Sequence, residues 1–358
     1  MIPHLSMRYA NQGKIDIVKC ALVTLMVILC GAQFVAAGPA NAEPGEIPPG
    51  GTQGAADGSH IVSSAVGPDG VVDVVVHSAA MSSDMAVKVL PAADRSSPVP
   101  TTYLLNGAAG GKGGSSWFDR TDITSFFAGE DVNVVVPMGG AASYFTDWRH
   151  DDPTLGRQKW ATFLTEELPP LMDSEFNGNG RNAIAGISMA GTSVFQLVLR
   201  APDLYRAVGA YSGCAMTSDP EGQAFVRLTV EGRGGGNTVN MWGPPTDPEW
   251  VRNDPYVNAE KLRGKAIYLS NGTGLPGEYD VLDGPGINGD VPKLADQVAV
   301  GAVIETATNR CSVRMRDRLQ QLRIPATIDL GDPGTHSWAY WQDDLHESWP
   351  LFRSALAG

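Results

Sequence analysis

Residues 182–200 read NAIAGISMAGTSVFQLVLR, and the order of residue types in this stretch decides the fold. Residues 182–185 are a short apolar run of the kind that forms a strand buried on both faces. Residues 189–200 have the apolar spacing of a helix, and Ser188 lies between the two among small neighbours. A strained strand-to-helix turn of this kind raises a serine hydroxyl above a sheet as a nucleophile. The alternative interpretation is a glycine-containing strand end that only packs closely on a helix.

Similar patterns recur on both sides of this turn. Apolar runs predict strands at 71–76, 102–105, 132–136, 182–185, 207–211, 266–269 and 326–330. Helical spacing predicts helices at 160–174, 189–200 and 305–322. Alternation of strands and helices is typical of a doubly wound, mostly parallel sheet. We therefore expect a single α/β domain with helices on both faces of the sheet, and a long loop at 271–292.

The N-terminal segment predicts a secretory signal peptide. Lys14 and Lys19 precede an apolar run that starts at Cys20, and Ala40-Asn41-Ala42 is a cleavage pattern. The competing interpretation is a membrane anchor, because a run of this length could just span a bilayer. We expect a signal peptide at 1–42, a leader rich in Glu, Pro and Gly at 43–58, and one domain at 59–358.

Charge and cysteine content narrow the function classes. The formal net charge of the chain is −13, and removal of the signal peptide would make it more negative. A chain this acidic is a poor partner for nucleic acid. No second apolar run of spanning length follows the first, so we expect action at the cell envelope or outside the cell without a retained transmembrane helix. Cleavage would leave Cys214 and Cys311, and a disulfide between them is the simplest expectation in an oxidising compartment.

A histidine downstream of Ser188 is needed as its base. In α/β hydrolases the chain order is nucleophile, acid, histidine. His336 lies in a loop after a predicted strand, where its imidazole can reach the serine as a general base. His346 falls on a predicted terminal helix and is more typical of a surface side chain. Spacing does not choose the acid among Asp280, Asp283, Asp290, Asp296 and Glu305.

Several further motifs occur in order between about residue 60 and the C-terminus. In these motifs the chain resembles the antigen 85 mycolyltransferases: PMGG at 137–140, SYFTDW at 143–148, GISMAG at 186–191, NMWGP at 240–244, NDP at 253–255 and HSWAYW at 336–341. The runs LLNG at 104–107 and YSGC at 211–214 look closer to the corynomycolyltransferase branch. The resemblance implies one α/β-hydrolase domain that moves mycolyl chains between trehalose monomycolate molecules or onto cell-wall arabinogalactan.

The resemblance also selects the acid. It places Glu305 at the family's glutamate position, so that Ser188, Glu305 and His336 form the expected catalytic triad. We nominate the backbone N–H groups of Met189 and Ala108 as the oxyanion hole. Met189 follows the nucleophile, and Ala108 lies in the loop after a neighbouring strand. We expect neither a metal nor a cofactor.

The sugar-binding part of the resemblance is incomplete. Where the family has Asp-Gly-Leu-Arg, this chain has NGAA at 106–109 and therefore lacks a charged pair. We take Asn106, Ser337 and Trp338 as candidate substrate-binding residues, because an amide both donates and accepts hydrogen bonds and an indole offers an aromatic face. The alternative for Trp338 is a structural anchor beside the histidine.

Three functional classes remain open. The first is mycolyl transfer through a Ser188 acyl-enzyme, and the second is a secreted carboxylesterase or lipase that delivers the acyl group to water. The third is a non-catalytic cell-surface binding protein, which would have no need to keep Ser188, Glu305 and His336 together. Transfer and hydrolysis differ in whether an acceptor sugar or water reaches the acyl-enzyme first.

Overall fold

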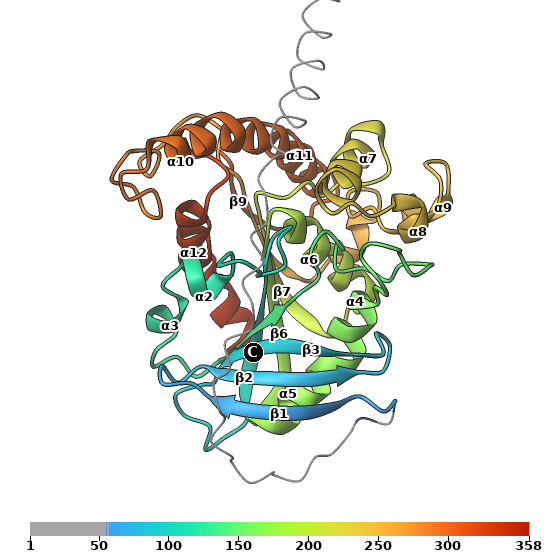
Figure 1. The fold of residues 1–358 in the computed structure, drawn as a ribbon, viewed down its shortest axis with the longest axis vertical. Helices are drawn as coiled ribbons and strands as arrows, with labels where there is room; N and C mark the ends of the chain where they lie inside the picture. The colour runs from blue at the N-terminus through green and yellow to red at the C-terminus, as the bar shows by residue number, and fades with distance from the viewer. Residues whose placement is uncertain (1–54, 56, 358) are drawn as a thin grey trace, which may run out of the picture. The chain divides into compact units, whose positions relative to one another are not determined.

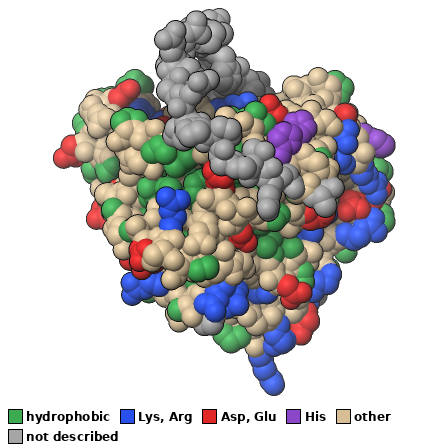
Figure 2. All heavy atoms as spheres, turned by 90° about the horizontal axis from the view of Figure 1, so that it is seen from below, with side chains coloured by type: hydrophobic (Ala, Val, Ile, Leu, Met, Phe, Trp, Pro, Cys, Tyr) green, Lys and Arg blue, Asp and Glu red, His purple; other side chains and the backbone are tan. Residues whose placement is uncertain are grey.

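The computed structural model of the chain describes residue 55 and residues 57–357. The predicted signal peptide and most of the predicted leader lie outside the described residues. Over the described part of the chain, none of the helices has the length and apolarity needed to cross a membrane. Acidic and basic side chains are interspersed on the face that Figure 2 shows.

The described strands form a nine-stranded sheet in the order β1-β2-β3-β5-β4-β6-β7-β8-β9. Neighbours from β1 to β5 pair antiparallel, and β5, β4, β6, β7, β8 and β9 run parallel to one another. The strands are β1 (His60–Val66), β2 (Val72–Ser78), β3 (Ser83–Leu90), β4 (Val99–Leu105), β5 (Asn133–Met138), β6 (Gly178–Ile187), β7 (Tyr205–Tyr211), β8 (Ala266–Ser270) and β9 (Thr327–Asp329).

The helical segments lie between and after these strands (Figure 1). They are α2 (Trp117–Arg120), α3 (Ile123–Phe126), α4 (Trp160–Thr162), η2 (Phe163–Glu167), α5 (Leu168–Phe176), α6 (Met189–Arg200), α7 (Pro220–Arg227), η3 (Leu228–Arg233), α8 (Thr238–Trp242), α9 (Pro248–Arg252), η4 (Ala259–Leu262), α10 (Val291–Asp296), η5 (Gln297–Gly301), α11 (Ala302–Gln321) and α12 (Trp338–Ala357). The predicted single α/β domain with a mostly parallel, helix-flanked sheet is confirmed.

Strand β6 shows why the parallel part of the sheet needs helices on both faces. Successive side chains of a strand point to opposite faces. Ile184 belongs to the apolar core that includes Phe195 of α6, whereas Ala183 and Ala185 belong to the core that includes Phe352 of α12. All of these side chains are buried, so the second half of the strand, residues 183–187, is a continuous apolar run.

The predicted elements differ from the structure in two respects. The sequence predicts no strand at β1 or β3, because these strands contain polar residues and lack a continuous apolar run. The helix predicted at 305–322 belongs to a longer helical segment that begins with α10 and continues through η5 into α11, across the top of Figure 1. Asp290 caps its start by accepting from the Lys293 N–H, so the predicted loop ends where a capped helix begins.

The predicted disulfide between Cys214 and Cys311 is present. Cys214 lies shortly after β7, and Cys311 lies on α11 six residues beyond Glu305. The bond therefore ties the helix that carries Glu305 to the loop at the carboxyl end of β7. It closes a loop with a sequence separation of 97 residues.

We expect the Cys214→Ala, Cys311→Ala double variant to unfold with a free energy about 2–5 kcal/mol lower than wild type, because a bond across a long loop restricts the unfolded chain. Denaturant unfolding of both proteins measures this difference. As a control, a reducing agent should bring the wild type to the stability of the variant. Alkylation of both thiols in the unfolded, non-reduced wild type would contradict the pairing.

Candidate active site

Ser188 occupies a strained turn between β6 and α6. Its φ is 55° and its ψ is −121°, outside the regions that a serine ordinarily adopts. Its N–H donates to the Tyr211 carbonyl oxygen over 2.8 Å, which fixes the turn to β7. The small neighbours are required by packing. A Cβ on Gly186 would lie 2.8 Å from the Cβ of Ala190, and one on Gly191 would lie 2.9 Å from the Cα of Gly213.

The structure brings the three predicted triad residues together. The Nε2 atom of His336 lies 2.8 Å from Ser188 Oγ, and its Nδ1 atom lies 2.7 Å from Glu305 Oε2. His336 comes from the loop after β9, Ser188 from the turn after β6 and Glu305 from the first turn of α11. The imidazole meets the Trp341 indole edge-on, with ring centroids 4.8 Å apart. This geometry lets the imidazole take the serine proton while the carboxylate faces its other nitrogen.

The second oxygen of Glu305 is held by three donors. Its Oε1 atom accepts from Ser212 Oγ at 2.7 Å, from Asn271 Nδ2 at 2.7 Å and from the Gly272 N–H at 2.8 Å. The Glu305 side chain is 1% exposed. A buried carboxylate is costly unless its oxygens accept hydrogen bonds, and here both oxygens do.

Sequence reasoning missed Ser212 and Asn271, although a signal for both was present. Ser212 follows β7 directly, and Asn271 follows β8. Polar residues at the carboxyl ends of neighbouring parallel strands share one edge of the sheet. Ser212 has a φ of 51°, and its Oγ also accepts from the Trp341 indole N–H at 2.9 Å. The donors that hold Glu305 are therefore supplied by the same sheet edge that carries Ser188.

The other candidate acids lie elsewhere. Asp280 is buried, and its carboxylate accepts from Thr335 and Tyr340. Asp283, Asp290 and Asp296 are exposed. The second candidate base, His346, is paired with Asp122 at 2.9 Å and stacked on Phe126. Geometry therefore favours Glu305 and His336 over the alternatives that spacing alone leaves open.

A second carboxyl group near Glu305 has an altered titration. Burial raises the pKa of Asp344 well above its usual value, and the nearby charges of Glu305, Asp329 and Glu347 raise it further. The Asp344 carboxyl is therefore biased toward its neutral form.

The proposed oxyanion donors lie on the two sides of Ser188. Met189 is the first residue of α6, where the helix leaves its N–H groups without carbonyl partners of its own. The loop after β4 lies against the serine, since a Cβ on Gly107 would be 3.4 Å from Ser188 Cβ. Ala108, the next residue in this loop, is partly exposed. A developing negative charge beside Ser188 could be met by both N–H groups.

A strained segment at 139–145 contacts both proposed oxyanion residues. Ala142, Tyr144 and Phe145 all have positive φ values, between 46° and 55°. The Ala142 N–H donates to the Ala108 carbonyl oxygen at 3.0 Å, and the Tyr144 N–H donates to Met189 Sδ at 3.4 Å. Burial raises the pKa of Tyr144 to about 12, so its phenol stays neutral. The PMGG and SYFTDW motifs thus serve the site through backbone contacts.

The three candidate sugar-binding residues differ in their exposure and in their hydrogen-bond partners. Asn106 has no exposed surface, because its Nδ2 donates to the Pro137 carbonyl oxygen and its Oδ1 accepts from the Trp117 N–H. This placement argues against a direct sugar contact, so we leave Asn106 out of the sugar site. Ser337 Oγ is buried and has no hydrogen-bond partner among the described residues. Trp338 is partly exposed and packs edge-on against Trp117 and Trp341, an arrangement that favours its role as an anchor.

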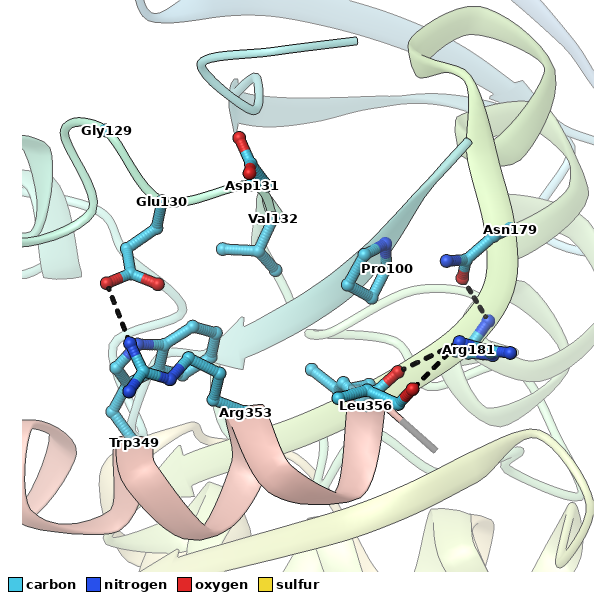
Figure 3. A pocket seen from close by; sticks show the side chains of 11 residues that line it. Pro100, Gly129, Glu130, Asp131, Val132, Asn179, Arg181, Trp349, Arg353 and Leu356 are labelled. Carbon is cyan, nitrogen blue, oxygen red and sulfur yellow. Dashed lines mark hydrogen bonds and ion pairs between the residues drawn. The ribbon is translucent and has the colours of Figure 1, made fainter. Parts of the chain in front are cut away.

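Other features of the described residues lie apart from this site. None of their His, Cys, Asp and Glu side chains forms a group of three or more that could hold a metal ion. A cavity of about 470 Å³ (Figure 3) lies at the amino ends of the parallel strands. Its Arg181 donates to the last carbonyl groups of α12, and its Arg353 pairs with Glu130. Ser188 lies beyond the other end of β6, about 25 Å away at 3.3 Å per residue.

Comparison with known proteins identifies the family. The model of the family described as putative esterase matches residues 78–352. The chain is 32% identical over 267 residues to the diacylglycerol acyltransferase/mycolyltransferase Ag85A of Mycobacterium leprae, and the match covers 72% of this chain and 76% of the relative. The chain belongs to the antigen 85 family of esterase-like acyltransferases. Ag85B of Mycobacterium avium is 29% identical over 78% of this chain and 82% of its own length.

A solved structure agrees with the fold of this family member. Mycobacterium tuberculosis MPT51 superposes with a TM-score of 0.63 and 22% sequence identity, over 78% of this chain and 96% of that protein. An identity this low supports the fold alone. The family membership rests on the sequence matches.

We expect Glu305→Gln to lower kcat for an activated ester by about 10⁴-fold, by analogy with the loss seen when a triad carboxylate becomes an amide. If the amide oxygen keeps the donors Ser212, Asn271 and Gly272, its NH₂ group faces His336 Nδ1. The imidazole proton then moves to Nε2, where it blocks proton transfer from Ser188.

The matched control is Asp296→Asn, an exposed carboxylate at the end of α10, which should leave kcat unchanged. Steady-state ester hydrolysis measures both variants. A Glu305→Gln enzyme within about tenfold of wild-type kcat would exclude Glu305 as the triad acid.

Proposed function

We propose that this chain is a secreted serine acyltransferase that carries a mycolyl-type chain from trehalose monomycolate to a second sugar hydroxyl. The acceptor is another trehalose monomycolate or cell-wall arabinogalactan. The observation that carries the proposal is the hydrogen-bonded series Ser188–His336–Glu305. The relatives, whose names describe acyl and mycolyl transfer, support the chemistry. The YSGC and LLNG runs favour an acyl chain of the corynomycolyl type.

In the first half-reaction, Ser188 Oγ attacks the ester carbonyl carbon while His336 Nε2 takes the hydroxyl proton. The N–H groups of Met189 and Ala108 stabilise the oxyanion, and Glu305 stabilises the protonated imidazole. The ester C–O bond then breaks. His336 returns the proton to the leaving sugar oxygen, trehalose departs, and the acyl group remains on Ser188.

In the second half-reaction, His336 takes a proton from the acceptor sugar hydroxyl. The acceptor oxygen attacks the acyl-enzyme carbonyl, and the bond to Ser188 Oγ breaks as His336 reprotonates the serine. Water in place of the sugar would give hydrolysis, so net transfer requires that the acceptor be positioned before water. Neither step needs a metal or a cofactor.

We expect purified wild-type protein to convert trehalose monomycolate into trehalose dimycolate and free trehalose, as measured by mass spectrometry of the extracted lipids. Ser188→Ala should lose this activity by about 10⁴-fold or more, because the covalent intermediate cannot form. The control is Asp283→Asn, which changes an exposed carboxylate. Free mycolic acid as the only acyl product would instead indicate a hydrolase, and retained transfer by Ser188→Ala would reject the mechanism.

We also propose that residues 1–42 are removed on secretion. N-terminal sequencing of the protein from culture fluid or the cell envelope should then begin at Glu43, because Ala40-Asn41-Ala42 presents small residues to the signal peptidase. Substitution of Ala42 by a bulky residue should leave unprocessed precursor in the membrane fraction. Mature protein that begins at Met1 would contradict the proposal.

A further inference from the structure

The proposed general base lies on a segment without regular secondary structure. His336 is located between the end of β9 and the start of α12. Segments of this kind are mobile unless their backbone and side chains are tied down. Proton transfer from Ser188 requires a fixed imidazole, since misplacement by about 1 Å can cost about 100-fold in rate. The contacts that hold this segment therefore affect the reaction directly.

The carboxylate of Asp280, outside the proposed triad, accepts hydrogen bonds from residues on both sides of His336. Asp280 is 8% exposed. Its Oδ1 atom accepts from Thr335 Oγ1 at 2.6 Å and from Gln297 Nε2 at 2.8 Å. Its Oδ2 atom accepts from Tyr340 Oη at 2.8 Å and from the Gly277 N–H at 2.8 Å. The four donors belong to four parts of the chain, and hydrogen bonds to a charged acceptor are stronger than neutral ones.

We propose that Asp280 is a positioning residue that holds the imidazole of His336 in line with Ser188. The inference rests on the proposed acyl transfer at Ser188. Asp280 acts through Thr335, which precedes the histidine, and through Tyr340, which lies in the first turn of α12 after it. The carboxylate thus fixes the chain on both sides of His336.

The backbone of His336 is tied to the same helical turn that Asp280 contacts. The His336 N–H donates to the Gly301 carbonyl oxygen at 3.3 Å. A Cβ on Gly301 would lie 3.3 Å from the His336 nitrogen and 3.4 Å from Thr335 Cβ, so the approach is close. Gln297 and Gly301 both belong to η5, which continues into the helix of Glu305. Asp280 therefore couples the position of the base to that of its acid.

Tyr340 ties the start of α12 to the long loop after β8, which contains Asp280. Tyr340 Oη also accepts from the Tyr279 N–H at 3.2 Å, and its ring lies against Gly334, where a Cβ would be 3.2 Å from it. Burial and the Asp280 carboxylate raise the pKa of Tyr340, which keeps its phenol a donor. Asp280→Asn would replace one carboxylate oxygen by an NH₂ group, which cannot accept from the two donors that face that oxygen. Only a carboxylate therefore accepts from all four donors.

The decisive experiment compares two substitutions of Thr335. Thr335→Val keeps the shape of the side chain and removes the hydroxyl that donates to Asp280, whereas Thr335→Ser keeps the hydroxyl and removes a methyl group. We expect Thr335→Val and Asp280→Asn to lower kcat by about 10- to 100-fold with KM within about twofold of wild type. Thr335→Ser should retain most of kcat. Asp283→Asn is the matched control in the same loop.

A role in packing alone predicts the opposite order, with the valine variant active and the serine variant impaired, and that result would overturn the proposal. Wild-type kcat in both Thr335→Val and Asp280→Asn would also overturn it. Thermal unfolding of each variant shows whether a loss of kcat reflects loss of the fold.

A readout that does not depend on turnover separates this inference from the proposed function. The proton between His336 Nδ1 and Glu305 Oε2 should give a far-downfield ¹H resonance in the wild type. We expect Asp280→Asn and Thr335→Val to shift or broaden it, and Asp283→Asn to leave it unchanged. An unperturbed resonance in the first two variants would reject the positioning role. Absence of Ser188-dependent activity with all acyl esters would reject the proposed function instead.

Discussion

The buried carboxylate of Glu305 is the group on which the rest of the site depends. A charge that is 1% exposed is stable only if donors replace the water it has lost. One of its oxygens faces His336, and the other is held by Ser212, Asn271 and Gly272. These donors come from the carboxyl ends of β7 and β8. The demand of one charge for hydrogen bonds thus fixes α11, two strand ends and the histidine relative to one another.

The same edge of the sheet explains the residues around Ser188. The turn after β6 holds the serine at a φ of 55°, and strain of this kind persists only where the surroundings hold it in place. Close packing of α6 on β6 and on the loop after β7 leaves no space for side chains at Gly186 and Gly191. The segment at 139–145 adds further positive φ values while it supports Met189 and Ala108. Backbone strain and small residues are therefore concentrated around Ser188 and the backbone groups proposed as oxyanion donors.

Around this centre lies a set of contacts that hold the elements carrying His336 and Glu305. The disulfide fixes α11 to the loop after β7. Asp280 gathers Gln297, Thr335 and Tyr340, and the Trp341 indole N–H donates to Ser212. Most of these contacts join a segment that lacks regular structure to one that has it, and the bond from Thr335 to Asp280 joins two such irregular segments. Such second-layer contacts are what keep a reactive geometry within tenths of an ångström.

The sequence by itself determined the α/β fold class, the strand-turn-helix around Ser188, and the histidine that follows it in the chain. These features are local: apolar runs and helical spacing report burial within one element, and the turn needs small residues at adjacent positions. Similarity of the motifs to a known family pointed to Glu305, which spacing alone left among five acids. Antiparallel β1 and β3 escaped prediction because their polar residues break the apolar run.

Only the tertiary structure decided which distant groups meet. Ser188 and His336 are separated by 148 residues in the chain and hydrogen-bonded in the fold. The donors Ser212 and Asn271, the buried position of Asn106 and the four bonds of Asp280 likewise follow from the order of strands in the sheet and from how loops pack at its carboxyl edge. Hydrogen bonds between residues far apart in sequence leave no periodic pattern along the chain. They become visible when the parallel strands bring their carboxyl ends to one edge.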